Sequence, residues 1–390
     1  MITTIPRAGP RRGPDGDAGT VMQAIDDVAD ELNDGVQERD GAATFSHEAW
    51  RRCADVGLFR LTVPVELGGL GLGPEEAVTV MEHFGRACTD AGLVFAVNSI
   101  IWTGVMPLVW FGDADQVERY LGPMCDGELI VGHAMTEPES GSDAFALQTV
   151  ARRVGDGYEL TGQKMLISNA PIADLFLVYA RTDPSGGPFG ISVFLVERSA
   201  PGLRIGPALS TMGLRTATLG SLELDRCHVP GTHLLGGVGG GMALFSKAMV
   251  WERGCLLAAG LGVMERQLER GVRRAQQRRQ FGRPIGSNQA IAHRLADMRV
   301  RVDASRLLVA RWAQVQASGR DAAVEASIAK LFVSESLIQS STSSFEIFGG
   351  YGYLSENDVE RELRDAFASR IYGGTSEMQR NIIARHLGLS

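Results

Sequence analysis

The sequence changes its hydrophobic periodicity twice, and these changes constrain the fold more than any other feature. Between residues 21 and 130, apolar side chains recur every three or four positions, as they do in amphipathic helices. Between residues 131 and 240, short runs such as DLFLVYARTD and GISVFLVE are bounded by turn-forming residues, as strands are. The helical pattern then returns from 241 to 390. The sequence therefore predicts an α+β chain with a helical domain, a β domain and a second helical domain.

The middle segment contains no helical stretch long enough to cross between parallel strands, so an antiparallel sandwich or barrel is predicted. Residues 243–279 read as one long helix, and two more long helical stretches follow, which is typical of a bundle. Residues 1–20 are rich in Pro, Gly and Arg without periodicity, and we expect a disordered lead-in there.

Composition narrows the class of partner. The formal net charge of -8 argues against nucleic acid, which a basic face would indicate. The five cysteines are single and lack the spacing of metal ligands, so we expect reduced thiols and no metal. The N-terminus has no apolar signal region, and no later run reaches the roughly 18 apolar residues of a membrane span. We expect a cytoplasmic protein that acts away from membranes.

Two polar motifs could bind a cofactor. MTEPESGSDA (135–144) offers hydroxyls and exposed amides for a polar ring or phosphates, although the same composition fits a surface loop. In RRQFGRPIGSNQAIAHRLADM (278–298), arginines could bind a pyrophosphate and Phe281 could pack on an adenine. A solvated basic face beside a helix turn is the alternative there. GGVGGGM (236–242) lacks the spacing of a dinucleotide fingerprint, so we interpret it as a flexible helix entry.

The C-terminal segment 346–388 carries two Gly-Gly turns joined by a charged, helix-like stretch. The second turn lies in IYGGTSEMQR (371–380), which has hydroxyls and a carboxylate but no side chain at its apex. Glycine pairs of this kind let the backbone approach a ligand closely. Together with the two polar motifs, these two turns make four blocks. Their order along the chain is a more specific family signature than any one block alone.

In these four blocks, the chain from about residue 22 to its end resembles the acyl-CoA dehydrogenase family. The resemblance implies a helical N-terminal domain (21–130), a middle antiparallel β domain (131–240) and a C-terminal four-helix bundle (241–390), with one FAD per subunit. It also implies a homotetramer, or less often a homodimer, in which the turn after the long helix reaches the neighbouring subunit's flavin. An electron-transfer flavoprotein is the redox partner that the resemblance suggests.

The resemblance assigns the FAD contacts residue by residue. Those to the flavin ring and its ribityl chain would come from Thr136, Gly141 and Ser142. Leu166 and Ser168 stand where many relatives have a tryptophan against the flavin and a threonine near its N5 atom. The pyrophosphate and adenine contacts across a subunit interface would come from Arg278, Phe281 and Gln289. The rest of the FAD cradle would be Glu346, Gly349, Gly350, Thr375 and Glu377.

The chemistry of the family needs a carboxylate that removes the α-proton of a thioester while the β-hydride passes to the flavin. Many relatives have a glutamate just after the tyrosine of the terminal motif, but here Gly373 follows Tyr372. Isovaleryl-type relatives carry the glutamate on the long helix of the C-terminal domain, and Glu252 in AMVWERGCLLAAG matches that arrangement. The resemblance therefore implies Glu252 as the base, with Arg253, Tyr372 and Gly373 at the substrate.

The residues alone leave Glu252 open to another interpretation, because a carboxylate in an apolar stretch can be buried as an ion pair with an arginine. For the whole chain, we expect a FAD-dependent dehydrogenase of an acyl thioester, carried by coenzyme A or by an acyl carrier protein, as in relatives from natural-product pathways. The alternatives are an oxidase that returns electrons to oxygen, and a catalytically decayed flavoprotein scaffold.

Overall fold

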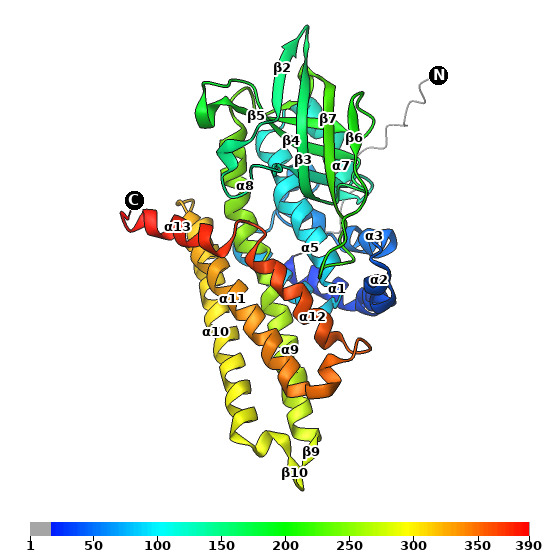
Figure 1. The fold of residues 1–390 in the computed structure, drawn as a ribbon, viewed down its shortest axis with the longest axis vertical. Coiled ribbons are helices and arrows are strands. Elements are labelled where there is room, and N and C mark those ends of the chain that lie inside the picture. The colour runs from blue at the N-terminus through cyan, green and yellow to red at the C-terminus, as the bar shows by residue number, and fades with distance from the viewer. Residues whose placement is uncertain (1–16, 390) are drawn as a thin grey trace.

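The computed structural model describes residues 17–389, which form a helical domain, a β domain and a bundle of long helices (Figure 1). The helices of the first domain are α1 (Ala18–Asn33), α2 (Val36–Ala42), α3 (His47–Asp55), α4 (Pro74–Ala87), α5 (Ala91–Ile100), α6 (Met106–Phe111) and α7 (Ala114–Cys125). Most of the predicted lead-in lies outside the described residues. Its last three residues are helical, because Asp17 caps α1 by accepting a hydrogen bond from the Thr20 backbone N–H.

A π-helical turn, Ile101–Val105, joins α5 to α6 into one stretch, Ala91–Phe111. The prediction that no run has the length and apolarity of a membrane span was wrong, because an 18-residue window of this 21-residue stretch has a mean hydropathy of 1.8. Its apolar character has a structural reason, since 89% of the apolar window is buried inside the protein. A helix that is covered on all sides is apolar all round.

The β domain contains one sheet with the strand order β6-β7-β3-β2-β4-β5-β8, and β1 also pairs with β4. The strands are β1 (Val131–Ala134), β2 (Val150–Val154), β3 (Gly157–Ser168), β4 (Leu175–Arg181), β5 (Ile191–Glu197), β6 (Leu203–Ile205), β7 (Leu219–Pro230) and β8 (Leu234–Leu235). The prediction of a purely antiparallel sheet was wrong at β4, which pairs in parallel with β1 and, through Val150 and Arg181, with β2. Residues 135–174 return the chain in the same direction through a loop and two strands, so no crossover helix is needed.

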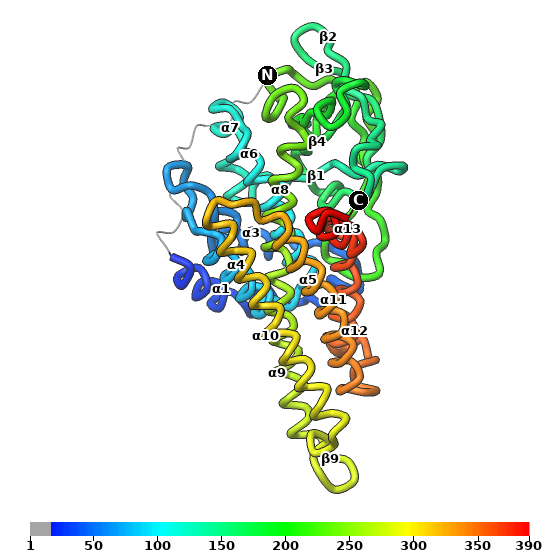
Figure 2. The backbone as a smooth tube through the Cα atoms, turned by 90° about the vertical axis from the view of Figure 1, so that its left-hand side faces the viewer, coloured from blue at the N-terminus to red at the C-terminus, as the bar shows by residue number. Residues whose placement is uncertain are grey.

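The third domain consists of α8 (Gly241–Cys255), α9 (Ala258–Gln277), α10 (Gln289–Ala317), α11 (Ala323–Phe348), α12 (Asp358–Phe367) and α13 (Ser376–His386). A small hairpin of β9 (Arg279–Gln280) and β10 (Arg283–Pro284) joins α9 to α10 at the far end of the bundle (Figure 2). Two short 3₁₀ turns follow the later helices, Gly349–Tyr353 after α11 and Ala368–Arg370 after α12.

The single long helix predicted over 243–279 is broken at residues 256–257 into α8 and α9. On either side of the break, a glycine makes a contact too close for any side chain. A Cβ on Gly254 would lie 2.2 Å from the Trp312 ring, and one on Gly262 would lie 2.0 Å from the Glu82 carbonyl oxygen. The break lets α8 and α9 each follow their own close neighbour, which periodicity alone does not reveal.

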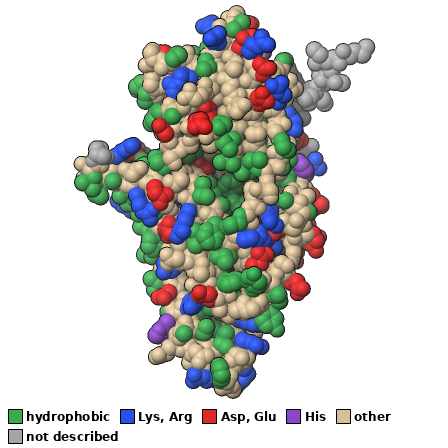
Figure 3. All heavy atoms as spheres, in the orientation of Figure 1, with side chains coloured by type: hydrophobic (Ala, Val, Ile, Leu, Met, Phe, Trp, Pro, Cys, Tyr) green, Lys and Arg blue, Asp and Glu red, His purple; other side chains and the backbone are tan. Residues whose placement is uncertain are grey.

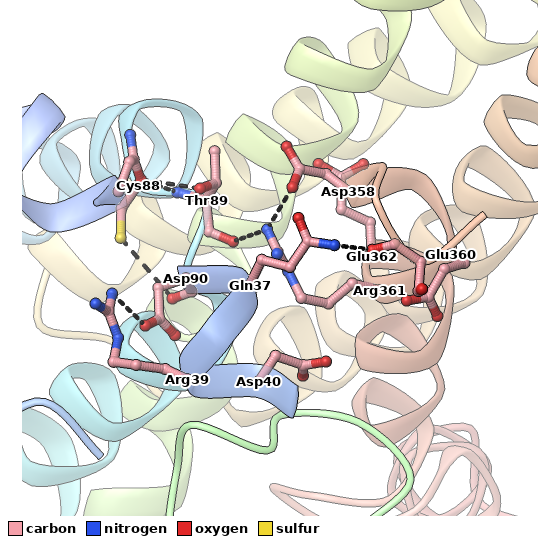
Figure 4. Close-up of polar contacts among 12 residues, drawn as sticks. Gln37, Arg39, Asp40, Cys88, Thr89, Asp90, Asp358, Glu360, Arg361 and Glu362 are labelled. Atoms are coloured by element: carbon pink, nitrogen blue, oxygen red, sulfur yellow. Dashed lines mark hydrogen bonds and ion pairs between the residues drawn. The ribbon is translucent and has the colours of Figure 1, made fainter. Parts of the chain in front are cut away.

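A polar network joins the first domain to α12, as Figure 4 shows. Arg39 of α2 pairs with Asp90 at 3.2 Å, and Arg361 of α12 donates to the Thr89 carbonyl oxygen at 3.4 Å. The β6–β7 loop joins the same network, because the Leu214 N–H donates to Asp365 and the Thr216 hydroxyl to Asp90. All three domains therefore meet at the helix that leads into the 371–375 turn.

Candidate active site

Glu252 lies in the last turn of α8, which runs from the β domain into the bundle (Figure 1). Its side chain is 7% exposed, and within residues 17–389 it makes no hydrogen bond or ion pair. Burial raises the pKa of the Glu252 carboxyl to about 7, against the opposing influence of the Arg253 and Lys330 charges. The alternative interpretation, in which Glu252 forms a buried ion pair with an arginine, is therefore not supported among the described residues.

Arg253 connects the helix of Glu252 to the C-terminal turn. Its Nε donates to the Gly373 carbonyl oxygen at 2.8 Å, although 120 residues separate the two in sequence. The Gln379 side chain donates to the carbonyl oxygens of Gly373 at 3.2 Å and Gly374 at 2.8 Å. Both glycines have left-handed φ angles, 63° and 90°, which glycine adopts without strain. The turn is thus held by side chains from α8 and α13.

Tyr372 and Gly373 complete this side of the site. The Tyr372 ring packs on Phe95 of α5 with centroids 5.0 Å apart, and burial, with the Glu252 charge as a smaller cause, raises the pKa of its phenol. A Cβ on Gly373 would have only the Arg253 Cγ within 4 Å, at 3.8 Å. The structure therefore brings Glu252, Arg253, Tyr372 and Gly373 together and leaves open space at Gly373.

The predicted flavin contacts in the β domain also come together. The Met165 N–H donates to the Thr136 carbonyl oxygen at 3.0 Å, so the end of β3 lies beside the 135–144 loop. A register shift between Lys164 and Ile167 gives Leu166 a φ of 55° and leaves its side chain 50% exposed. Gly141 and Ser142 are exposed on the same loop. Leu166 is therefore an apolar surface displayed next to polar loop atoms.

A buried ion pair that the sequence reasoning missed holds this loop in place. The Lys164 Nζ lies 2.7 Å from Glu137 Oε1 and 3.1 Å from the Met135 carbonyl oxygen. Glu137 also accepts hydrogen bonds from the backbone N–H groups of Gln148 and Thr149. The signal was present as a lysine on the buried face of the β3 pattern, where a charge needs a partner.

The other predicted cofactor residues do not join this group within one chain. Arg278, Phe281 and Gln289 lie at the hairpin end of the bundle, away from the β domain (Figure 1), and Phe281 is 97% exposed. Glu346 pairs with Arg294, and Gly349 and Gly350 begin the turn after α11 with open space around them.

The last two predicted cofactor residues belong to the start of α13. Thr375 caps the helix by accepting a hydrogen bond from the Met378 N–H at 3.3 Å, and the exposed Glu377 pairs with Arg380 at 3.2 Å. Both lie directly after the turn that Arg253 holds. On the face shown in Figure 3, the surface is hollowed between the β domain and the helices, and hydrophobic side chains line the hollow.

Models of protein families match all three domains of the chain. The matches are to the acyl-CoA dehydrogenase N-terminal domain over residues 21–128, the middle domain over 132–227 and the C-terminal domain over 239–388. The chain belongs to the acyl-CoA dehydrogenase family. The family resemblance, the three-part α+β fold and the FAD cofactor predicted from the four sequence blocks are thereby confirmed.

Individual relatives are similar over nearly the whole chain. An L-prolyl-[peptidyl-carrier protein] dehydrogenase of Pseudomonas fluorescens is 43% identical over 346 residues, which cover 88% of this chain and 91% of that protein. The crystal structure of the prolyl acyl carrier protein oxidase AnaB has a TM-score of 0.93 and 40% identity, covering 95% of this chain and 99% of that one. PigA with FAD and proline has a TM-score of 0.93 and 34% identity, covering 95% and 97%.

Two features of the described residues are suited to binding FAD. The half-exposed Leu166 and the almost fully exposed Phe281 are apolar surfaces that a flavin ring and an adenine could cover. A Cβ on Gly141, Gly349 or Gly350 would have no atom within 4 Å, so a bulky group can approach the backbone at these glycines. Within one chain, Leu166 lies in the β domain and Phe281 in the hairpin between α9 and α10.

Proposed function

We propose that this protein is a FAD-dependent dehydrogenase that introduces a double bond into a prolyl group, or a similarly small acyl group, held as a thioester on a carrier protein. The observation that carries the dehydrogenase assignment is the buried Glu252 carboxyl, which has no partner within residues 17–389, beside the open space at Gly373. The substrate class is supported by the prolyl carrier-protein enzymes, which are similar over most of the chain.

In the proposed reaction, Glu252 takes the proton from the α-carbon of the thioester. FAD, held by residues that include Leu166 and the 135–144 loop, would supply the acceptor for the hydride from the β-carbon, so that the substrate would lose two hydrogens and gain one double bond. The raised pKa of Glu252, about 7, makes its carboxylate a stronger base than an exposed glutamate. Arg253 and Gln379 hold the turn that faces the base, and Gly373 leaves room for the acyl group.

The carrier is tested by offering the same acyl group in two forms. We expect prolyl-loaded carrier protein to bleach the flavin under anaerobic conditions at least about tenfold faster than prolyl-coenzyme A, since only the former presents a protein surface to bind. Absorbance of the oxidised flavin is the measurement. Equal or faster bleaching by the coenzyme A ester would contradict the carrier-protein proposal, and no bleaching by either would favour the decayed scaffold.

The same sample then identifies the electron acceptor. Rapid return of the oxidised flavin on admission of air indicates an oxidase. A reduced flavin that persists until an electron-transfer flavoprotein is added indicates a dehydrogenase in the strict sense.

We further propose a homotetramer, because the structure leaves apolar side chains exposed where a second copy would cover them. Val300 and Leu307 on α10 are 65% and 72% exposed, and they lie seven residues apart on one helix face. Light scattering should give a mass of about four times 41.9 kDa. Leu307→Glu should lower this mass, whereas Val65→Glu, at a residue that is 69% exposed in the 3₁₀ turn Val65–Leu67 of the first domain, should not. A monomer at micromolar concentration would contradict the proposal.

A further inference from the structure

Lys330 lies in the N-terminal third of α11 and is 1% exposed. Its Nζ has no hydrogen-bond partner within residues 17–389. A buried ammonium without a partner is costly, and such groups in native proteins call for an explanation. Lys164, the other fully buried lysine among the described residues, has its carboxylate partner Glu137 at 2.7 Å. The burial of Lys164 is therefore explained by its ion pair, whereas no partner within residues 17–389 explains the burial of Lys330.

The charged surroundings of Lys330 come from three helices. Glu252 and Arg253 of α8, Glu335 of α11 and Glu377 of α13 all act on its charge. The nearer carboxylates are not equally available, because Glu335 is already bound by Arg370 and by the Ser376 hydroxyl at 3.1 Å. Glu377 is exposed and pairs with Arg380. Glu252 is thus the buried carboxylate in this group that lacks another partner among the described residues.

We propose that Lys330 is a positioning residue for Glu252, whose ammonium charge keeps the buried carboxyl in the ionised form that accepts a proton. This inference rests on the proposed role of Glu252 as the base. The Arg253 charge also lowers the pKa of the Glu252 carboxyl, and its Nε is held at the turn by the Gly373 carbonyl oxygen. Lys330 adds a second positive charge from α11, which packs on α8, and its Nζ makes no hydrogen bond within residues 17–389.

The titration of the two groups supports this arrangement. Burial, followed by the Arg253 charge, lowers the pKa of the Lys330 ammonium to about 8, while burial raises that of the Glu252 carboxyl to about 7. Near pH 7.5 the lysine is therefore still mainly charged while the glutamate is mainly ionised. Removing a positive charge beside a carboxylate raises the pKa of the carboxylate, and between buried charges a shift on the order of one pH unit is expected.

The test is the pH profile of kcat/KM for Lys330→Met, with FAD loading confirmed by absorbance. Glu252 acts only when ionised, so activity falls as the pH drops through its pKa. In Lys330→Met this acidic limb should move up by about one pH unit, giving about tenfold lower activity at pH 6.5. Above pH 8, wild-type Lys330 loses its own charge, so the two proteins should differ by less than about twofold.

Three controls separate this role from a structural one. Lys330→Arg restores the charge and should return the limb toward its wild-type position. Lys247→Met removes a lysine that lies over the Trp110 ring and does not act on Glu252, so it should leave the limb in place. Lys330→Gln gives the same comparison if Lys330→Met does not accumulate as folded protein.

The inference would be overturned if folded, FAD-loaded Lys330→Met kept the acidic limb of its kcat/KM profile at the wild-type pH. It would also be overturned if kcat/KM fell by the same factor at all pH values. A double-mutant cycle with Glu252→Gln distinguishes this failure from that of the proposed function. If Glu252→Gln is inactive and Lys330→Met shifts nothing, only the role of Lys330 is wrong. If Glu252→Gln remains fully active, the base itself is misassigned. In the Glu252→Gln background, Lys330→Met should change the residual rate by less than about twofold at every pH.

Discussion

Glu252→Gln should lower the rate of flavin reduction by thioester substrate about a thousandfold or more, because the amide has the size of the carboxylate but cannot accept the α-proton. General bases typically contribute about 10²–10⁴-fold. The measurement is single-turnover bleaching in a stopped-flow instrument. FAD binding should be unchanged, since none of the residues proposed to contact the cofactor is altered. A Glu252→Gln protein that binds FAD and turns over at the wild-type rate would contradict the assignment.

Stability provides an independent check that Glu252→Gln is correctly folded. The pKa of the Glu252 carboxyl is about 7 in the folded protein and 4.5 for an exposed glutamate, so the folded state binds this proton more tightly. Its carboxyl therefore destabilises the fold increasingly as the pH rises from 4.5 to 7, reaching on the order of 3 kcal/mol above pH 7. Glutamine has no such cost. The free energy of unfolding at pH 8 should be equal or higher in Glu252→Gln than in the wild type.

The order of the domains could be predicted from periodicity, and the family could be predicted from four short blocks, because these features are local in sequence. The parallel pairing of β1 with β4 could not, since it depends on how about 40 intervening residues return the chain. The break between α8 and α9 was also missed. On either side of this break, Gly254 and Gly262 are in close contact with residues of other helices, and no pattern within 243–279 contains those neighbours.

At the candidate site, the sequence predicted Glu252 as the base through a residue that is missing, since Gly373 stands where the family resemblance implies a glutamate in many relatives. The sequence could not show whether Glu252 was paired, because the candidate arginines come from many places in the chain. Lys330 was missed for the same reason: AKLFVSES reads as an ordinary helix segment. Only the packing of α11 on α8 brings its charge to act on Glu252, and only the three-dimensional structure shows that its ammonium has no hydrogen-bond partner within residues 17–389.

Moving the base to residue 373 should partly restore the activity that Glu252→Gln removes. The space exists, because a Cβ at this position would meet only the Arg253 Cγ at 3.8 Å. The φ of 63° is the left-handed conformation, so any side chain there costs about 1–2 kcal/mol of stability. We expect Glu252→Gln with Gly373→Glu to reduce flavin about tenfold or more faster than Glu252→Gln alone, since the new carboxylate starts from the turn that Arg253 holds beside the site.

The matched control is Glu252→Gln with Gly373→Gln, which has the same shape at position 373 and no base, and it should stay at the level of Glu252→Gln. Equal rates for the two double variants, with FAD bound in both, would show that the turn does not face the reacting carbon. In the wild-type background, Gly373→Glu should instead lower activity, and most strongly for cyclic or branched acyl groups, because the side chain fills the acyl space. Two nearby carboxylates also raise each other's pKa values, so this loss should be greatest below pH 7. The pair of residues 252 and 373 would then be one functional unit, in which a carboxylate at either position requires a small or neutral residue at the other.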